Sequence, residues 1–395
     1  MSSILWACWD GGGNLPPGLG IAAALRQRGH DVRFFGRPEM VGRAEAAGVR
    51  ATAFTHARTD LGRYSFHPMA TVFGYTSSPA VGEELLGIVA DSGPDLVVVD
   101  AMFAAALHVA PQFGRPTAVM LHTFCHRMID AWRANFTMQS ESRQRAGLGG
   151  LPALDELWGG RDLLHVNTLP DLDGEPAVDW PNVVHGAPVL VSERRAVAAA
   201  LPWADDDPTP VVLLSFSTVP EQRDPVTLQR ALDALAPLPV HVVATTGQVV
   251  DPGELSAPGN AWLTPFADHD RLLERAAVMV GHGGHGTTMR ALRHGVPIVG
   301  IPNKAVDQAG ITRLIEEWGA GLALPPDAGA DRIQAAVRDI LADGRFTESA
   351  RRLSLSFAAR DDGASLAADS VQSLLDKSGC NIQGVTATVL PGSPG

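Results

Sequence analysis

The chain has 395 residues, of which 45% are hydrophobic and 19% charged, a balance typical of a globular protein with material for two cores. Its net charge of −12 at pH 7 argues against nucleic acid or an anionic membrane surface as a partner. Cys8, Cys125 and Cys380 are far apart and lack metal-ligand spacing. No Lys or Arg precedes the first short apolar run, and no apolar stretch approaches ~18 residues. We therefore expect a cytoplasmic protein without signal peptide or membrane span.

The first half of the chain alternates strand and helix patterns. Continuous apolar runs are typical of buried parallel strands, and apolar residues at helical spacing lie between them. The expected elements are a strand at 4–9, a helix at 19–29, a strand at 30–36, a helix from 84, a strand at 97–100, a further helix and a strand at 117–121. Residues 124–158 carry helical patches with poor patterning, and short strands are expected at 162–167 and 182–186.

A second series of strands and helices follows a segment at 201–210 that is rich in Pro and Asp and reads as a linker. Its strands are expected at 211–217, 240–247, 277–281 and 297–302, and its helices at 224–238, 269–276, 286–295, 308–319, 331–343, 347–360 and 365–377. The fold class is thus α/β, with two facing Rossmann-like doubly wound domains and a ligand cleft between them. The expected boundaries are 1–200, a linker at 201–210, 211–378 with its last helices packing back on the first domain, and a disordered tail at 379–395.

The segment VGHGGHGTT, residues 280–288, is the most informative motif. Gly281, Gly283 and Gly286 satisfy G-x-G-x-x-G after a strand and before a helix, with an acidic residue, Asp307, further on. Asp307 lies past the end of the next strand and the motif comes late in its domain, so a dinucleotide site is poorly supported. A phosphate fits better, because glycines let backbone amides approach an anion and a helix N-terminus attracts it.

The stretch FADHDRLLERAAVMVGHGGHGTTMRALRHGVPIVGIPNKAVDQ, residues 266–308, resembles the donor-binding signature of family 1 glycosyltransferases of the GT-B fold. The similarity is greatest to the bacterial branch that glycosylates natural products such as antibiotics. RGHDV at 28–32 and SFST at 215–218 fit the same family. The resemblance is strong over the C-terminal domain, weaker over 1–120, and poor between 124 and 200.

The resemblance implies a role for each matching residue. The donor pyrophosphate would be held by His282, Gly283, Gly284, Gly286 and Thr287, with Ser217 and Thr218 approaching the phosphates from another loop. Phe266 would pack on the nucleotide base, and Asp307 with Gln308 would bind the sugar hydroxyls. From the residues alone, Asp307 and Gln308 also read as a solvated helix start.

The implied reaction is inverting transfer from a nucleotide diphosphate sugar, a TDP-deoxysugar above all, to a hydrophobic natural-product acceptor. It needs no metal and no cofactor, since the donor is a substrate and backbone amides can stabilise the leaving diphosphate. The Asp runs at 171–173 and 205–207 read as solvated loops rather than metal ligands. The acceptor would bind loops 60–90 and 122–160 of the first domain, and the chain would act as a monomer or homodimer.

One residue departs from the family pattern. The family has a histidine where Asn14 stands, which deprotonates the acceptor, and an aspartate matching Asp100 orients it. An amide cannot accept a proton at neutral pH. Asp100 could then be the base itself; Asp10, His122, or His126 with Asp130 could replace the histidine; or an acidic acceptor could need little help, with Asn14 orienting it or capping the helix.

Asp100 is the favoured catalytic candidate, because a carboxylate that closes a buried apolar strand has few structural reasons to be there. Two other readings remain. One is a non-catalytic partner that has kept the fold; the other is an epimerase or oxidoreductase, although neither Tyr64 nor Tyr75 has the Lys that a short-chain enzyme needs. The sequence leaves open the sugar, the acceptor, and whether oxygen, nitrogen or carbon is glycosylated.

Overall fold

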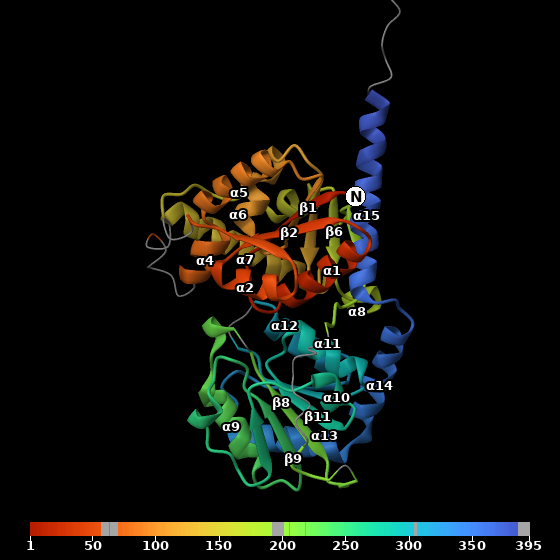
Figure 1. Ribbon diagram of the computed structural model, residues 1–395. Helices are drawn as coiled ribbons and strands as arrows, with labels where there is room; N and C mark the ends of the chain where they lie inside the picture. Colours follow the sequence, from red (N-terminus) through yellow and green to blue (C-terminus); the bar gives the residue numbers. More distant parts are fainter. Residues whose placement is uncertain are drawn as a thin grey trace, which may run out of the picture. The chain divides into compact units, whose positions relative to one another are not determined.

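The computed structural model describes residues 1–56, 63, 70–191, 201–204, 206–217, 219–303 and 306–385. The chain divides into two compact units. The N-terminal unit comprises Met1–Asp10, Asn14–Val189 and the segment that begins at Asp362, and the C-terminal unit comprises Gly11–Gly13 and Leu190–Asp361. Figure 1 shows each unit built around its own sheet.

The N-terminal unit contains a seven-stranded parallel sheet in the order β3-β2-β1-β4-β5-β6-β7. Its strands are β1 (Ser3–Cys8), β2 (Asp31–Gly36), β3 (Arg50–Ala53), β4 (Leu96–Asp100), β5 (Thr117–Leu121), β6 (Leu163–Val166) and β7 (Val183–His185). Every residue of β4 and β5 is buried, as their unbroken apolar sequences predict. Because the strands are parallel, the loops that follow β1, β4, β5, β6 and β7 leave from one edge of the sheet.

Helices flank this sheet. They are α1 (Leu15–Gln27), α2 (Pro38–Ala46), α4 (Ala70–Thr76), α5 (Pro79–Ser92), α6 (Ala104–Val109), α7 (Ile129–Arg145), α8 (Pro170–Asp173) and α15 (Gly363–Val385), with short turns η2 (Ala110–Gln112), η3 (His126–Met128) and η4 (Asp155–Gly159). The C-terminal helix α15 runs beside α1 (Figure 1) and is tied to the end of α1 by an ion pair between Arg28 and Asp369 at 2.8 Å.

The C-terminal unit contains a six-stranded parallel sheet in the order β10-β9-β8-β11-β12-β13. Its strands are β8 (Val211–Ser215), β9 (His241–Thr245), β10 (Ala261–Thr264), β11 (Ala276–Gly281), β12 (Ile298–Gly300) and β13 (Gly321–Ala323). Its helices are α9 (Pro225–Leu235), α10 (His269–Leu273), α11 (His285–Arg293), α12 (Gln308–Glu317), α13 (Ala330–Ala342) and α14 (Gly344–Ala358), with turns η5 (Pro220–Gln222) and η6 (Pro252–Glu254). Aliphatic side chains of the strands, α9 and α13 form its core.

The expected α/β architecture of two doubly wound sheets is confirmed, since in each sheet the strand order reverses beside the first strand, β1 or β8. The sequence pattern missed β3, β10 and β13, which are short edge strands without a fully buried face. Within the described residues α15 continues to Val385, past the point at 378 where the pattern ended. No helix in the described part of the chain is long and apolar enough to cross a bilayer.

Candidate active site

Asn14 lies in the glycine-rich turn between β1 and α1, at the N-cap position of α1. Its side chain does not cap the helix. An N-cap side chain binds the amides of the second and third helical residues, and here these are Pro16 and Pro17, which have no N–H. The capping role considered from the sequence is therefore wrong. The Asn14 amide instead donates to the Oδ2 atom of Asp100 at 2.7 Å, with Cys8 Sγ 3.6 Å away.

Asp100 ends β4, next to β1 in the sheet, and is only 3% exposed. The indole N–H of Trp9 at 3.2 Å and the amide of Met102 at 3.0 Å both donate to Oδ1, while Asn14 occupies Oδ2. Burial raises the pKa of Asp100 to about 6, and the hydrogen bonds from Asn14, Met102 and Trp9 act in the opposite direction. The result is a carboxylate of fixed orientation that titrates near the pH at which enzymes work.

Asp10 follows β1 in a left-handed conformation, with φ of 52°, and is 8% exposed. Its two carboxylate oxygens accept from one guanidinium nitrogen of Arg43 at 3.2 and 3.1 Å. Its backbone carbonyl accepts from Arg37 at 3.5 Å. This ion pair gives Asp10 a structural role in the turn, which weakens its candidacy as a base.

The remaining base candidates do not share the environment of the Asn14–Asp100 pair. His122 follows β5, the neighbour of β4, and its Nδ1 atom lies 3.2 Å from the amide nitrogen of Asn167. Asp130 is exposed on the first turn of α7, with 97% of its side-chain surface accessible, as the solvated-helix alternative holds. His126 contacts the ring of His185 rather than the Asn14–Asp100 pair.

In the C-terminal unit, the glycine motif joins β11 to α11. Gly283 has φ of +77°, and a Cβ atom there would come within 2.7 Å of Thr312, so the turn requires glycine. The N-cap of α11 is Gly284, which has no side chain to cap the helix, and no acidic residue lies in the first turn. Gly286 is exposed, with open space where a Cβ would stand. The first turn of α11 therefore carries no anionic side chain of its own that would compete for the N-terminal amides.

His282 is buried beneath this turn, and its ring lies near that of Phe216. Burial lowers the pKa of His282 to about 4, against a hydrogen bond with the backbone of Ser215. The imidazole is therefore neutral at physiological pH. Its Nδ1 atom is buried and has no hydrogen-bond partner among the described residues. An orphaned buried nitrogen at a helix N-terminus is a feature that a bound phosphate would explain.

Asp307 and Gln308 begin α12, and the two residues differ in their contacts. Gln308 is 3% exposed and fully engaged: its oxygen accepts from the amide of Asn303 at 2.9 Å, and its nitrogen donates to Gln222 at 3.0 Å. Asp307 is the N-cap residue but makes no capping bond, and burial raises its pKa to about 6. Because Asp307 is part-buried and does not cap α12, it does not fit the alternative of an aspartate at a solvent-exposed helix start.

The other donor candidates are less constrained. Ser217 is buried and its hydroxyl accepts from the amide of Val219 at 3.2 Å. Phe266 is 43% exposed, so its ring is available to a planar ligand. Thr287 is half-buried in the first turn of α11. Thr218 lies outside the described residues.

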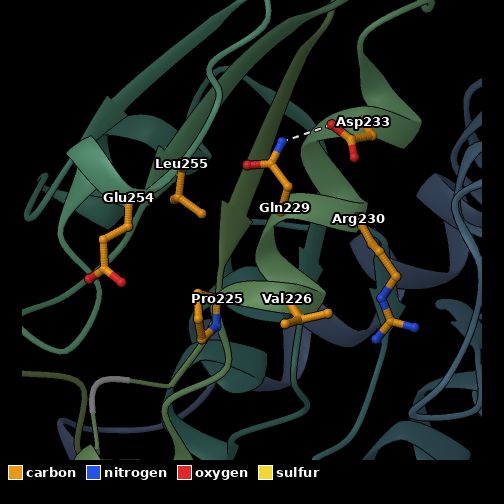
Figure 2. Close-up of a pocket in the computed structure, with 7 residues that line it drawn as sticks. All are labelled: Pro225, Val226, Gln229, Arg230, Asp233, Glu254 and Leu255. Carbon is orange, nitrogen blue, oxygen red and sulfur yellow. Dashed lines mark hydrogen bonds between the residues drawn. The ribbon is translucent and has the colours of Figure 1, made fainter.

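A shallow pocket on the C-terminal unit lies apart from these residues in the fold. Figure 2 shows its lining, contributed by α9 and the turn η6: Pro225, Val226, Gln229, Arg230, Asp233, Glu254 and Leu255. The side chain of Gln229 is tied to Asp233 at 2.8 Å and to the backbone of Ser256. None of the candidate site residues lines this pocket.

Trp9, which the sequence did not mark as a candidate, donates its indole N–H to Asp100. It follows β1 directly, and the available signal was its place at the carboxyl end of a central strand beside β4. Gln222 was also missed; its contact with Gln308 joins η5 to α12 and could not be read from spacing.

Comparison with known proteins bears on the fold and the class of enzyme. Residues 229–372 match the family described as erythromycin biosynthesis protein CIII-like, C-terminal domain. The chain is 28% identical to the 4'-demethylrebeccamycin synthase of Lentzea aerocolonigenes in an alignment 411 positions long, which covers 91% of this chain and 96% of that protein. It is also similar to the solved structure of the calicheamicin glycosyltransferase CalG4, with a TM-score of 0.72 and 24% identity over 95% of this chain and 99% of that one. The spinosyn rhamnosyltransferase SpnG, solved with thymidine diphosphate, gives a TM-score of 0.69 and 20% identity over 93% and 99%.

These similarities favour a glycosyltransferase over the epimerase and oxidoreductase readings. Matched to the glycine turn of α11 and to the two parallel sheets, they identify the chain as a glycosyltransferase of natural-product biosynthesis with the GT-B fold.

Proposed function

We propose that the chain transfers a deoxysugar from a TDP-sugar to a hydrophobic natural-product acceptor with inversion at the anomeric carbon, and that Asp100 is the base. The observation that carries this proposal is the hydrogen-bonded pair of Asn14 and Asp100, which stands where the family has histidine and aspartate. TDP is favoured as the nucleotide because a similar structure was solved with thymidine diphosphate.

Asp100 would accept the proton of the acceptor as the new bond to the anomeric carbon forms. A carboxylate with a pKa of about 6 is ionised at neutral pH, yet far more basic than an ordinary aspartate. Trp9 and Met102 hold one oxygen, so the carboxylate cannot rotate, and Asn14 steadies its charge from the other oxygen. Asn14 is therefore a positioning residue, and it need not take a proton itself.

As the new bond forms, the bond from the anomeric carbon to the diphosphate breaks and the diphosphate gains negative charge. The amides of the first turn of α11 and the side chains of His282 and Thr287 would stabilise that charge. Asp307 would accept a hydrogen bond from a sugar hydroxyl, and the ring of Phe266 would pack on the base. The amide of Gln308 already binds Asn303 and Gln222, so this residue would act mainly by holding the loop that carries Asp307.

Calorimetric titration with TDP, UDP and, as a control, NAD tests the donor assignment. We expect saturable TDP binding that His282→Ala weakens at least tenfold, while Asp100→Asn leaves it unchanged. Tight binding of NAD, or TDP binding unaffected by His282→Ala, would refute the donor site. Once the nucleotide is known, mass spectrometry of acceptor mixtures with TDP-sugars reads the product, and the anomeric configuration reports inversion.

A further inference from the structure

A group of metal-ligating side chains lies in the N-terminal unit apart from the Asn14–Asp100 pair. His126 follows β5, Asp173 ends α8 after β6, and His185 ends β7. These three strands are neighbours in the parallel sheet, so their carboxyl ends bring the residues to one edge. One ligand atom from each residue lies within 4.8 Å of the others. Among the described residues, this is where three such atoms come together.

The aspartate of this group is held as a metal-ligating carboxylate would be. Asp173 is fully buried, and its oxygens accept the backbone amides of Cys125 at 3.1 Å and Arg127 at 3.2 Å. Backbone donors of this kind fix the orientation of ligating carboxylates in metal sites. A buried carboxylate also calls for a positive partner, and a cation meets that need more fully than amides alone.

The two histidines complete the set. His185 Nε2 lies 2.8 Å from Asp173 Oδ2, and the ring centroids of His126 and His185 are 5.2 Å apart. The Nδ1 atom of His126 accepts a long hydrogen bond, 3.4 Å, from the amide of Ala177. A tetrahedral zinc ion with ligands about 2.1 Å away holds neighbouring ligand atoms roughly 3.4 Å apart. To reach that spacing the His185–Asp173 contact would open from 2.8 Å, and the ligand atoms, which now lie within 4.8 Å of one another, would close around the ion.

We propose that His126, Asp173 and His185 bind a divalent transition-metal cation, zinc in preference to magnesium or calcium. Two imidazoles and one carboxylate are donors that suit zinc, while magnesium and calcium prefer oxygen. On binding, the metal replaces the proton shared by His185 and Asp173, and that proton moves to solvent or to the other ring nitrogen of His185. His185 is partly exposed, which gives the ion a path in.

The site is distinct from the transfer chemistry, which the proposed function assigns to Asp100 without a metal. Its effect would be to tie together the loops after β5, β6 and β7. The first of these loops leads into α7, within the 122–160 segment that the sequence analysis assigned to the acceptor. A bound metal would therefore make this segment more rigid and raise the thermal stability of the unit.

The test uses the full-length chain without a polyhistidine tag, stripped with chelator and titrated with Co²⁺ and then Zn²⁺. We expect one Co²⁺ per chain with the strong visible absorption of a four-coordinate site, displaced by Zn²⁺, and a Zn²⁺-dependent rise in Tm. His126→Gln and His185→Gln should each weaken binding at least tenfold and abolish the rise in Tm.

The matched control is His241→Gln. His241 pairs with Asp207 at the same 2.8 Å but lies outside the three-residue group, so its loss should leave Co²⁺ binding unchanged. If a histidine variant fails to fold, X-ray absorption of the zinc-loaded wild-type chain reads the two imidazoles directly. The proposal is overturned if the wild-type chain binds less than one ion, if the spectrum lacks imidazole, or if His241→Gln weakens binding as much as the site variants; Asp173 is then a structural carboxylate alone.

Discussion

The side-chain amide of Asn14 donates to Asp100 at 2.7 Å across two neighbouring strands, β1 and β4. The aspartate is thus anchored on both oxygens, since Trp9 and Met102 hold the other one. Asn14 keeps a hydrogen-bond donor beside the carboxylate of Asp100. Its amide cannot take a proton, as a histidine at this position would. Of the two side chains in this pair, only the carboxylate of Asp100 can accept a proton at neutral pH.

Replacing Asp100 by Asn should lower kcat by about 10²–10⁴-fold, because the amide cannot act as a base. The TDP affinity should stay within twofold of the wild type, since Asp100 belongs to the other compact unit from the glycine turn. Steady-state kinetics with calorimetry of TDP separates the two quantities. A variant with near-normal turnover would exclude Asp100 as the base and return attention to His122.

The rate should depend on pH with a limb near 6. Burial raises the pKa of Asp100 to about 6, and a base acts in its ionised form, so kcat/KM should fall as the pH drops through that value. The profile is measured between pH 4.5 and 8.5 in buffers of constant ionic strength, with the folded state monitored by circular dichroism. A flat profile over this range contradicts the assignment.

Trp9→Phe should move that limb upward by about half to one pH unit, because it removes a hydrogen bond that stabilises the ionised form of Asp100. Trp180→Phe is the matched control: Trp180 also donates its indole N–H to an aspartate, Asp155, on the surface. The control should leave the pH profile unchanged. An equal shift in both variants would mean that loss of an indole, rather than of this contact, alters the rate.

Asn14→His should restore a histidine beside Asp100, and the pH limb should then follow an imidazole whose pKa the carboxylate raises above its ordinary value near 6.5. The variant should remain active, whereas Asn14→Leu should lose most activity because Asp100 loses a hydrogen bond. Rate profiles of the two variants with the same acceptor provide the comparison. Equal activity in both would show that Asn14 has no part in positioning the carboxylate.

Gly286→Asp should weaken TDP binding about tenfold or more while leaving the fold intact. The added carboxylate stands in open space at the N-terminus of α11, where it favours the helix but repels a diphosphate. Gly286→Asn has nearly the same size without the charge and should bind TDP more tightly than the Asp variant. Calorimetry measures the TDP affinity of both variants, and thermal unfolding measures their Tm. For the Asp variant we expect the affinity to fall while the Tm stays the same or rises.

Much of this arrangement could be predicted from local sequence. Unbroken apolar runs located β4 and β5, and the charged residue that closes β4 marked Asp100 as unusual. The absence of capping by Asn14 was also readable, since Pro16 and Pro17 supply no N–H. The edge strand β3, with its polar and small residues, carries no such pattern because only part of it is buried.

Contacts between distant residues could not be predicted in this way. Trp9 and Asp100 are joined by the pairing of β1 with β4, and Gln308 meets Gln222 only because two loops follow strands on opposite sides of β11. His126, Asp173 and His185 come together because three neighbouring strands end side by side, and no fixed spacing along the chain marks these residues. The sheet topology, rather than the residue type, determines such contacts.

The two prolines that open α1 have a consequence for how this enzyme can change over time. Since the helix begins without help from the side chain at position 14, exchange of that residue costs α1 no capping bond, and its penalty falls on the hydrogen bond to Asp100. A substitution at this position, imidazole for amide included, would therefore alter the reactivity of the pair with Asp100 while leaving the start of α1 as it is. The turn separates reactivity from the formation of the helix.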